Sequence, residues 1–144
     1  MSDAGETVAD LLVTFLNGES YSLAFVATNP EDPQRELDLV GAAVLVEGLR
    51  VFVVPTGETR ERLDKAAVKV TTTVNIFISR VRKKEVTKKA LNELTSEILD
   101  SLDYIDMGTH TWEASETVSK YDVEKLEVQD RFLSVLGISY YDVV

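Results

Sequence analysis

Cysteine is absent from this sequence of 144 residues, and histidine and tryptophan each occur once. Without cysteine the chain has no disulfide, no thiolate nucleophile and no cysteine metal site, so its stability must come from core packing and subunit contacts. The single histidine, His110, has no second imidazole with which to share a metal ion. We interpret His110 as a structural residue.

The sequence also lacks the short motifs that usually mark catalysis or nucleotide binding. Its seven glycines form neither a Gly-x-Gly-x-x-Gly nor a Walker-type phosphate loop, and no Gly-x-Ser-x-Gly elbow occurs. Paired acids such as Asp103 and Asp106, or Glu31 and Asp32, are interpreted as solvated surface because acidic residues are numerous in this chain. We therefore expect no enzymatic activity, no catalytic or metal site and no cofactor.

Long hydrophobic runs are missing as well. No run approaches the roughly 18 apolar residues that a membrane span requires. Residues 1–6 are acidic and polar, where a secretory signal would be basic and then apolar. We expect a protein that is neither embedded in a membrane nor exported by that route, and a chain free of cysteine suits a reducing cytosol.

The composition that is present belongs to an ordinary globular protein. Hydrophobic residues make up 44% of the chain and charged residues 28%, and the length suits one domain over residues 1–144. Acidic residues outnumber basic ones, which gives a net charge of −10. This charge opposes general binding to the phosphate backbone of nucleic acids.

Hydrophobic periodicity predicts two amphipathic helices. The first covers residues 7–17 and ends before Gly18, which can adopt the left-handed conformation common at helix ends. The second begins at Thr87, carries an apolar stripe as far as Ile105 and ends by Gly108.

Alternating and β-branched segments predict the strands. They are residues 21–27, 50–55, 67–81, 109–117 and 131–144. Residues 56–64 are expected to form a charged loop, and residues 37–46 and 119–129 receive no assignment. The order of elements indicates an α+β fold, an antiparallel or mixed β-sheet with two main helices packed on it.

A basic segment stands out in this acidic chain. It contains Arg80, Arg82, Lys83, Lys84, Lys88 and Lys89. One interpretation is a solvated turn, since exposed charges cost little to hold. The other is a docking patch for an acidic surface of a neighbouring subunit or for passing DNA phosphates, and both interpretations stay open.

Apolar residues near the carboxyl-terminal end of the sequence form a second candidate contact surface. The final strand carries Tyr140 and Tyr141, and Phe77 lies among polar neighbours on the long strand. The final strand is either a central strand of the sheet or, with Phe77, part of a contact with another copy.

Four blocks then occur in order along the chain. They are residues 8–12 continuing to 22–25, residues 49–55, residues 74–78 and residues 131–140. Their order, the Val-Val-Pro strand end and the Phe-x-Ser-Val-Leu strand resemble the tail-terminator or neck (head-tail completion) proteins of tailed bacteriophages. The chain departs from that pattern in the apolar insert at residues 40–47 and in the acidic stretch before the last block.

The resemblance implies a structural virion protein without catalysis or cofactor. Such a protein forms a ring, typically a homo-hexamer, at the head-proximal end of the tail tube. The ring ends tube polymerisation and joins the tail to the head connector, and DNA passes through its lumen without specific binding. The implied location is the tail or neck of the virion, after synthesis in the cytoplasm of the bacterial host.

Two other assignments stay open on the sequence alone. The chain could be a different head-tail connector or tail-completion protein, which would be distinguished by the virion component that it binds. It could instead be a monomeric α+β ligand- or peptide-binding domain, which would carry a concave apolar pocket. A ring requires a heterologous interface, in which one patch of each subunit meets a different patch of the next.

Overall fold

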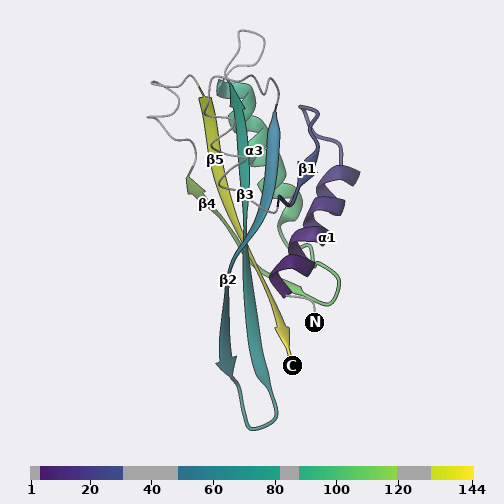
Figure 1. Cartoon of the computed structure of the whole chain (residues 1–144), viewed down its shortest axis with the longest axis vertical. Helices are drawn as coiled ribbons and strands as arrows, with labels where there is room; N and C mark the ends of the chain where they lie inside the picture. Colours follow the sequence, from purple (N-terminus) through teal and green to yellow (C-terminus); the bar gives the residue numbers. More distant parts are fainter. Residues whose placement is uncertain (1–3, 31–48, 82–87, 120–130) are drawn as a thin grey trace.

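The computed structural model describes residues 4–30, 49–81, 88–119 and 131–144. Within these ranges the elements are α1 (Ala4–Gly18), β1 (Ala27–Thr28), β2 (Arg50–Arg62), β3 (Val68–Val81), α3 (Lys88–Leu102), β4 (Thr111–Ser119) and β5 (Arg131–Val143). Figure 1 shows the strands crossing the molecule with the helices packed beside them. The predicted α+β fold with two helices on one sheet is confirmed.

The sheet is mixed and has five strands in the order β1-β2-β3-β5-β4. β1 runs parallel to β2, and the β2–β3, β3–β5 and β5–β4 pairs are antiparallel. The final strand β5 is therefore central, because β3 and β4 flank it on both sides. This agrees with the central-strand interpretation of the sequence.

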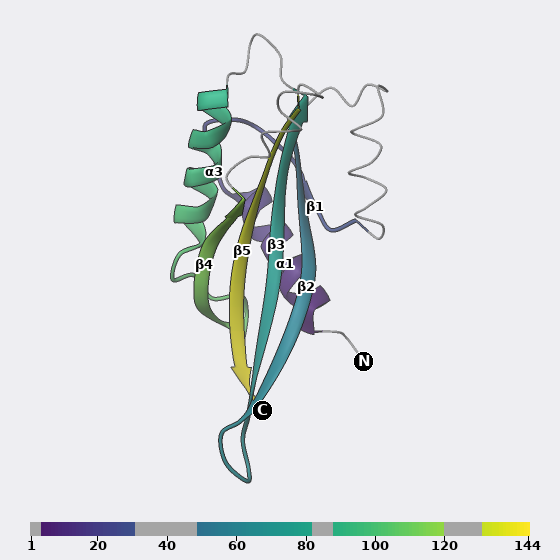
Figure 2. The same cartoon turned by 90° about the vertical axis from the view of Figure 1, so that its left-hand side faces the viewer.

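One face of the sheet carries the core. In β3 the even-numbered residues Val74, Ile76 and Ile78 are fully buried, as the predicted alternation required. The register places Ile76 opposite Val53 of β2 and Leu136 of β5, so the same face continues across three strands. Both helices contribute to this single cluster, α1 through Val8, Leu12 and Leu16, and α3 through Leu91, Leu94, Ile98 and Leu102. In Figure 2 the strands lie in front of α1.

Helix α1 is close to its prediction and extends three residues further at its amino-terminal end. Its last turn is tied to the sheet by Asn17. The Asn17 side chain accepts a hydrogen bond from the backbone nitrogen of Ala27 at 2.7 Å and donates one to the Ala27 carbonyl at 3.1 Å. These two bonds place β1 at the edge of the sheet, next to α1.

The strand predicted at residues 21–27 is wrong except at its end, where β1 is only two residues long. Tyr21, Leu23 and Phe25 are half-buried against the core, while the residues between them are exposed. The rings of Tyr21 and Phe25 stack at 5.4 Å, and the Tyr21 hydroxyl lies 2.8 Å from Ser101 Oγ on α3. The alternation therefore reflects packing against a helix and not a β-ladder.

The loop predicted at residues 56–64 is also wrong in most of its length, because β2 continues to Arg62. A β-bulge between Pro55 and Gly57 accommodates the proline, which cannot donate a backbone hydrogen bond. Pairing with β3 then continues to the Arg62–Val68 pair. We call residues 57–72 the arm. Figures 1 and 2 show the arm as a twisted hairpin that projects beyond both helices.

Helix α3 ends at Leu102, six residues before the predicted Gly108. Tyr104 then adopts φ 64°, the left-handed conformation that ends a helix, and the Ile105 nitrogen donates to the Leu102 carbonyl at 3.2 Å. Ile105 was expected on the helical stripe but lies in the following turn. Both ends of strand β4 lie within two residues of the predicted ends. Residues 37–46 and 120–129, which received no assignment from the sequence, lie outside the described residues.

Candidate functional site: the edges of the sheet

The structure describes only part of the basic segment predicted as a docking patch. Arg82, Lys83 and Lys84 lie outside the described residues, as does the side chain of Lys88. Arg80 is half-buried near the end of β3, and its Nε atom is buried without a hydrogen-bond partner among the described residues. Lys89 is exposed on the first turn of α3. Of the two described side chains, Lys89 is exposed and Arg80 is half-buried.

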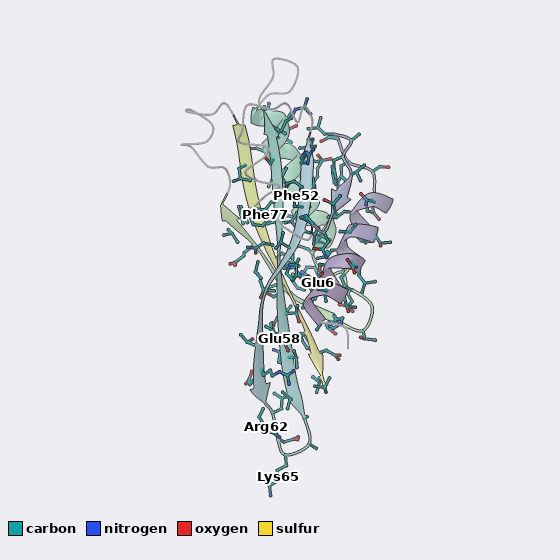
Figure 3. The ribbon with its side chains drawn as sticks, in the orientation of Figure 1. Glu6, Phe52, Glu58, Arg62, Lys65 and Phe77 are labelled. Atoms are coloured by element: carbon teal, nitrogen blue, oxygen red, sulfur yellow. The ribbon has the colours of Figure 1, made fainter. Side chains whose placement is uncertain are left out.

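The aromatic candidates separate into two groups. Tyr140 is fully buried in the core cluster, so its side chain is not available to a second molecule in this fold. Phe77 is half-buried on the opposite face of the sheet, directly across from Phe52 (Figure 3). Tyr141 is half-buried and shares the face of Phe77. Phe77 and Tyr141 thus keep some exposed surface and Tyr140 does not.

A charged brace joins the arm to the far edge of the sheet. Lys69 Nζ on β3 lies 2.6 Å from Glu113 Oε1 on β4 and 4.8 Å from the centre of the Tyr141 ring on β5. Glu113 occupies a β-bulge between Trp112 and Ala114, which allows its side chain to reach across β5. The hydrogen bond to Glu113 raises the pKa of Lys69 above its ordinary value. The brace holds the start of β3 against β4.

Two edges of the sheet lack a strand partner over long stretches of the described chain. β1 pairs with β2 only at Val51 and Phe52, so residues 53–62 of β2 have one edge without a ladder in the described ranges. At the other end of the sheet, β4 pairs with β5 alone in the same part of the chain. Such edges present backbone donors and acceptors that can pair with another chain.

The arm is a hydrogen-bonded hairpin although it is exposed. All residues from 56 to 66 are exposed, and Figure 3 shows Glu58, Arg62 and Lys65 along the arm. At its tip the Leu63 nitrogen donates to the Ala67 carbonyl at 3.0 Å, and the Arg62 guanidinium donates to the carbonyls of Asp64 and Lys65 at 3.3 and 3.4 Å. The side chains around the tip carry charges of both signs.

An exposed tyrosine and a half-buried tryptophan form an aromatic pair where β4 begins. The rings of Tyr104 and Trp112 have centroids 4.5 Å apart, and Tyr104 is 81% exposed. Trp112 is fixed, because its Nε1 donates to Ser115 Oγ and its backbone nitrogen donates to Asp106 Oδ1, both at 2.8 Å. We call Tyr104 and Trp112 the aromatic shelf. Asp106, considered above as half of an acidic pair, has a structural role in this turn.

A shallow groove of about 660 Å³ lies along α3. It is lined by polar residues, three of which are acidic: Ser22, Lys89, Asn92, Glu93, Ser96, Glu97 and Asp100. The Glu97 carboxylate accepts hydrogen bonds from the backbone nitrogen of Ser22, at 3.1 Å, and from the Ser22 hydroxyl. This contact ties the segment before β1 to α3, and we interpret the groove as part of the scaffold.

Sequence reasoning missed the arm, its free edge and the aromatic shelf. The sequence carries no strand signal for the arm, because residues 57–62 are exposed on both faces and show no alternation of apolar and polar residues. Leu63 was the one large apolar residue among these charges. No local signal separates an exposed Tyr104 from a buried one, because the helix was expected to continue past it.

Two further kinds of site were searched for in the described part of the chain, a metal site and a membrane-spanning helix. In these ranges no three His, Asp or Glu side chains are grouped so that they could hold a metal ion. None of the described helices has the length and apolarity needed to cross a bilayer. The chain matches no protein-family model and no curated protein sequence.

Proposed function

We propose that this protein is a structural component of a phage virion that assembles with copies of itself into a ring at the head-proximal end of the tail tube. The ring ends tube polymerisation and joins the tail to the head connector. The observation that carries the proposal is a pair of sheet edges that have no strand partner within the described part of the chain, residues 53–62 of β2 on one side and β4 on the other.

The two edges are suited to a head-to-tail contact. Because β2, β3, β5 and β4 are successively antiparallel, β4 of one copy and β2 of a neighbour in the same orientation meet as an antiparallel pair. The contact joins different patches of the two copies, so it is heterologous and leads to a ring when the rotation closes. An isologous dimer would use one patch twice and leave the other edge free.

The resemblance to tail-terminator and neck proteins concerns a connected part of the fold. Most of its residues lie on α1 and on the three adjacent strands β2, β3 and β5, while residues 22–25 lie between α1 and β1 outside any strand. Ile76 of the third block faces Val53 of the second and Leu136 of the fourth. The blocks therefore share one core, which supports a common scaffold over a chance likeness of separate strands.

The net charge of −10 supports passage of DNA through such a ring. Each phosphate that a lysine or arginine neutralises adds affinity through the release of counterions. A chain with an excess of acids offers few such contacts overall. We propose that DNA moves through the lumen without specific binding.

The mass of the purified protein in solution tests self-assembly. Light scattering over a range of concentrations should show a rise from 16.0 kDa to about 96 kDa, the mass of six copies, and negative-stain images should show rings. A monomer at every concentration that binds a small ligand or peptide would contradict the proposal and favour the binding-domain alternative. Rings that bind the head connector but leave tube ends free would assign the protein to another neck component.

A further inference from the structure

The strands β2, β3, β5 and β4 form rows, sets of residues that lie opposite one another on neighbouring strands. One row consists of Thr59, Thr71, Tyr141 and Thr111, in the order of the strands. The side chains of this row lie on the face of Phe77, away from the core cluster. Each such row begins at the β2 edge and ends at the β4 edge.

The backbone groups of β2 point alternately towards β3 and out of the sheet. Val68 and Val144 exchange two hydrogen bonds, of 2.8 and 2.9 Å, so Val68 of β3 directs its backbone groups towards β5. Every second residue of β3 does the same as far as Ile76, because no bulge interrupts the β3–β5 ladder. The β2 residues opposite them therefore direct their backbone groups outward: Val53, Pro55, Glu58, Arg60 and Arg62.

The outer edge of β4 follows the same alternation. Tyr140 of β5 is bonded to β3, so Trp112, which lies opposite Tyr140 on β4, directs its backbone groups outward. The hydrogen bond from the Trp112 nitrogen to Asp106 agrees with this direction. Ser115 and Thr117 also point outward. On both edges these residues have their side chains on the core face, so the two edges can pair with the helices of both copies on one side of the joined sheet.

Each edge also carries a bulge, and the two bulges adjoin the same row. In β2 the extra residue is Thr56, directly before Gly57, and in β4 it is Glu113, directly before Ala114. Gly57 and Ala114 are the two ends of one row. A strand with one extra residue stays in step with a partner strand that has an extra residue at the same level. The edges of β2 and β4 match in this respect.

We infer that β2 of one copy pairs with β4 of the next copy in register with the rows, so that each row continues from one copy into the next. The inference rests on the proposed self-assembly and specifies its contact. Beyond this ladder the rest of the arm extends past the start of β4, along the neighbour's turn between α3 and β4. The pairs between copies, with the β2 residue first, are Val53–Thr117, Pro55–Ser115, Glu58–Trp112 and Thr59–Thr111.

The position of the bulges distinguishes this register from others. A bulge or a proline also protects a lone edge strand from unwanted pairing. Such protection requires no particular row, whereas pairing requires the two bulges at one level, as observed. A copy displaced by two residues along the strands would keep the faces matched but would set each bulge against a regular strand. Pro55 has no N–H and the Trp112 N–H is bound to Asp106, so the pairs of Pro55 and Trp112 keep one hydrogen bond each.

Disulfide formation between single-cysteine variants tests the register, because the chain has no cysteine of its own. Thr59→Cys and Thr111→Cys proteins are mixed, assembled and oxidised, and the linked heterodimer is quantified by intact mass. In the inferred ladder Thr59 and Thr111 form a pair without mutual hydrogen bonds, whose Cα atoms lie about 4.5 Å apart, a distance that a disulfide can span.

Two control pairs differ from this one in row or in face. Thr59→Cys with Ala114→Cys has both side chains on the same face but in different rows, and Arg60→Cys with Thr111→Cys has them on opposite faces. We expect at least about tenfold more heterodimer from Thr59→Cys with Thr111→Cys than from either control.

Hydrogen–deuterium exchange of the unmodified protein gives a second measurement. Assembly should slow exchange at the backbone N–H groups of Glu58, Ser115 and Thr117 by at least about tenfold, because each gains a partner in the new ladder. The N–H of Thr71 is the control, since Thr71 is bonded to β2 within one copy and should change little.

The outcomes separate the register from the assembly. Rings in which Thr59 links preferentially to Ala114 would overturn the inference and leave the proposed function standing. Rings in which Glu58, Ser115 and Thr117 exchange as fast as in the dilute protein would do the same. A protein that stays a monomer in light scattering would overturn both.

Discussion

A Tyr140→Phe variant should stay stable at high pH under conditions where the wild-type protein loses roughly 2 kcal/mol of unfolding free energy between pH 10 and pH 12. Burial raises the pKa of the Tyr140 hydroxyl far above its ordinary value, and the negative charge of Asp106 adds to the shift. Phenylalanine has no proton to lose, so it removes this contribution.

The protein loses stability at high pH because folding raises the pKa of Tyr140. A group whose pKa is raised on folding contributes its full stability below its unfolded pKa, about 10 for tyrosine, and loses it as the pH rises further. In this window the unfolded chain releases the Tyr140 proton and the folded chain keeps it. The free energy of unfolding therefore falls by about 1.4 kcal/mol per pH unit from this residue.

Urea unfolding at pH 7, 10, 11 and 12 measures the effect. At pH 7 the variant should lie within about 1 kcal/mol of the wild type, because the buried hydroxyl has no hydrogen-bond partner among the described residues. The exposed Tyr104→Phe protein is the control and should follow the wild type. Lys69 and Tyr21 also have raised pKa values but are common to all three proteins. An equally steep loss in Tyr140→Phe would contradict the assignment.

The second large effect concerns the arm. Replacing residues 60–70 with Asn-Gly closes the hairpin at the Thr59–Thr71 pair with a two-residue turn that such hairpins favour. The core cluster contains none of the removed residues, so the shortened chain should fold with the same secondary structure. It loses residues 60–62 of the β2 edge together with the whole tip of the arm, so self-association should weaken by about a hundredfold or more.

Light scattering and circular dichroism of the shortened protein check this expectation. A folded monomer at concentrations where the wild type forms rings would agree with it. A milder variant, Arg60→Ala, keeps the backbone edge and loses only an exposed ion pair with Glu58, so its assembly should remain nearly intact. Normal rings from the shortened chain would show that the arm is not part of the interface.

The parts of the fold that the sequence predicts well are those in which one face is buried continuously. In β3 the alternation from Val74 to Ile78 correctly predicts which residues face the helices. The strand lies between β2 and β5, and a shift of its register by one residue would expose its buried side chains. Helix α1 is predicted for the same reason, since Val8, Leu12 and Leu16 repeat at the spacing of one helix face.

The errors arise where local pattern and long-range pairing disagree. Tyr21, Leu23 and Phe25 alternate like a strand, but β1 pairs with β2 only beyond them. Residues 57–62 look like a loop because neither face is buried, yet each of them pairs with a residue of β3. The end of α3 depends on the left-handed Tyr104, a conformation that the residue type does not favour.

The candidate contact surface was only partly predictable for a similar reason. Charge and hydrophobicity identify Lys89 and Phe77 as conspicuous residues, but they do not show which strands end the sheet. The free edges of β2 and β4 follow from the strand order, which is set by pairs far apart in the sequence such as Ile76 and Leu136. Tyr140, conspicuous in the sequence, belongs to the core instead.

The most direct test of the central claim is the length distribution of tail tubes polymerised with and without this protein. A tail-tube protein is allowed to polymerise in the presence of increasing amounts of the chain, and tubes are measured by negative-stain microscopy. The proposal predicts shorter tubes with a ring at one end, and the arm-shortened variant should leave the lengths unchanged. Wild-type protein that neither shortens the tubes nor appears at their ends would contradict the proposed function.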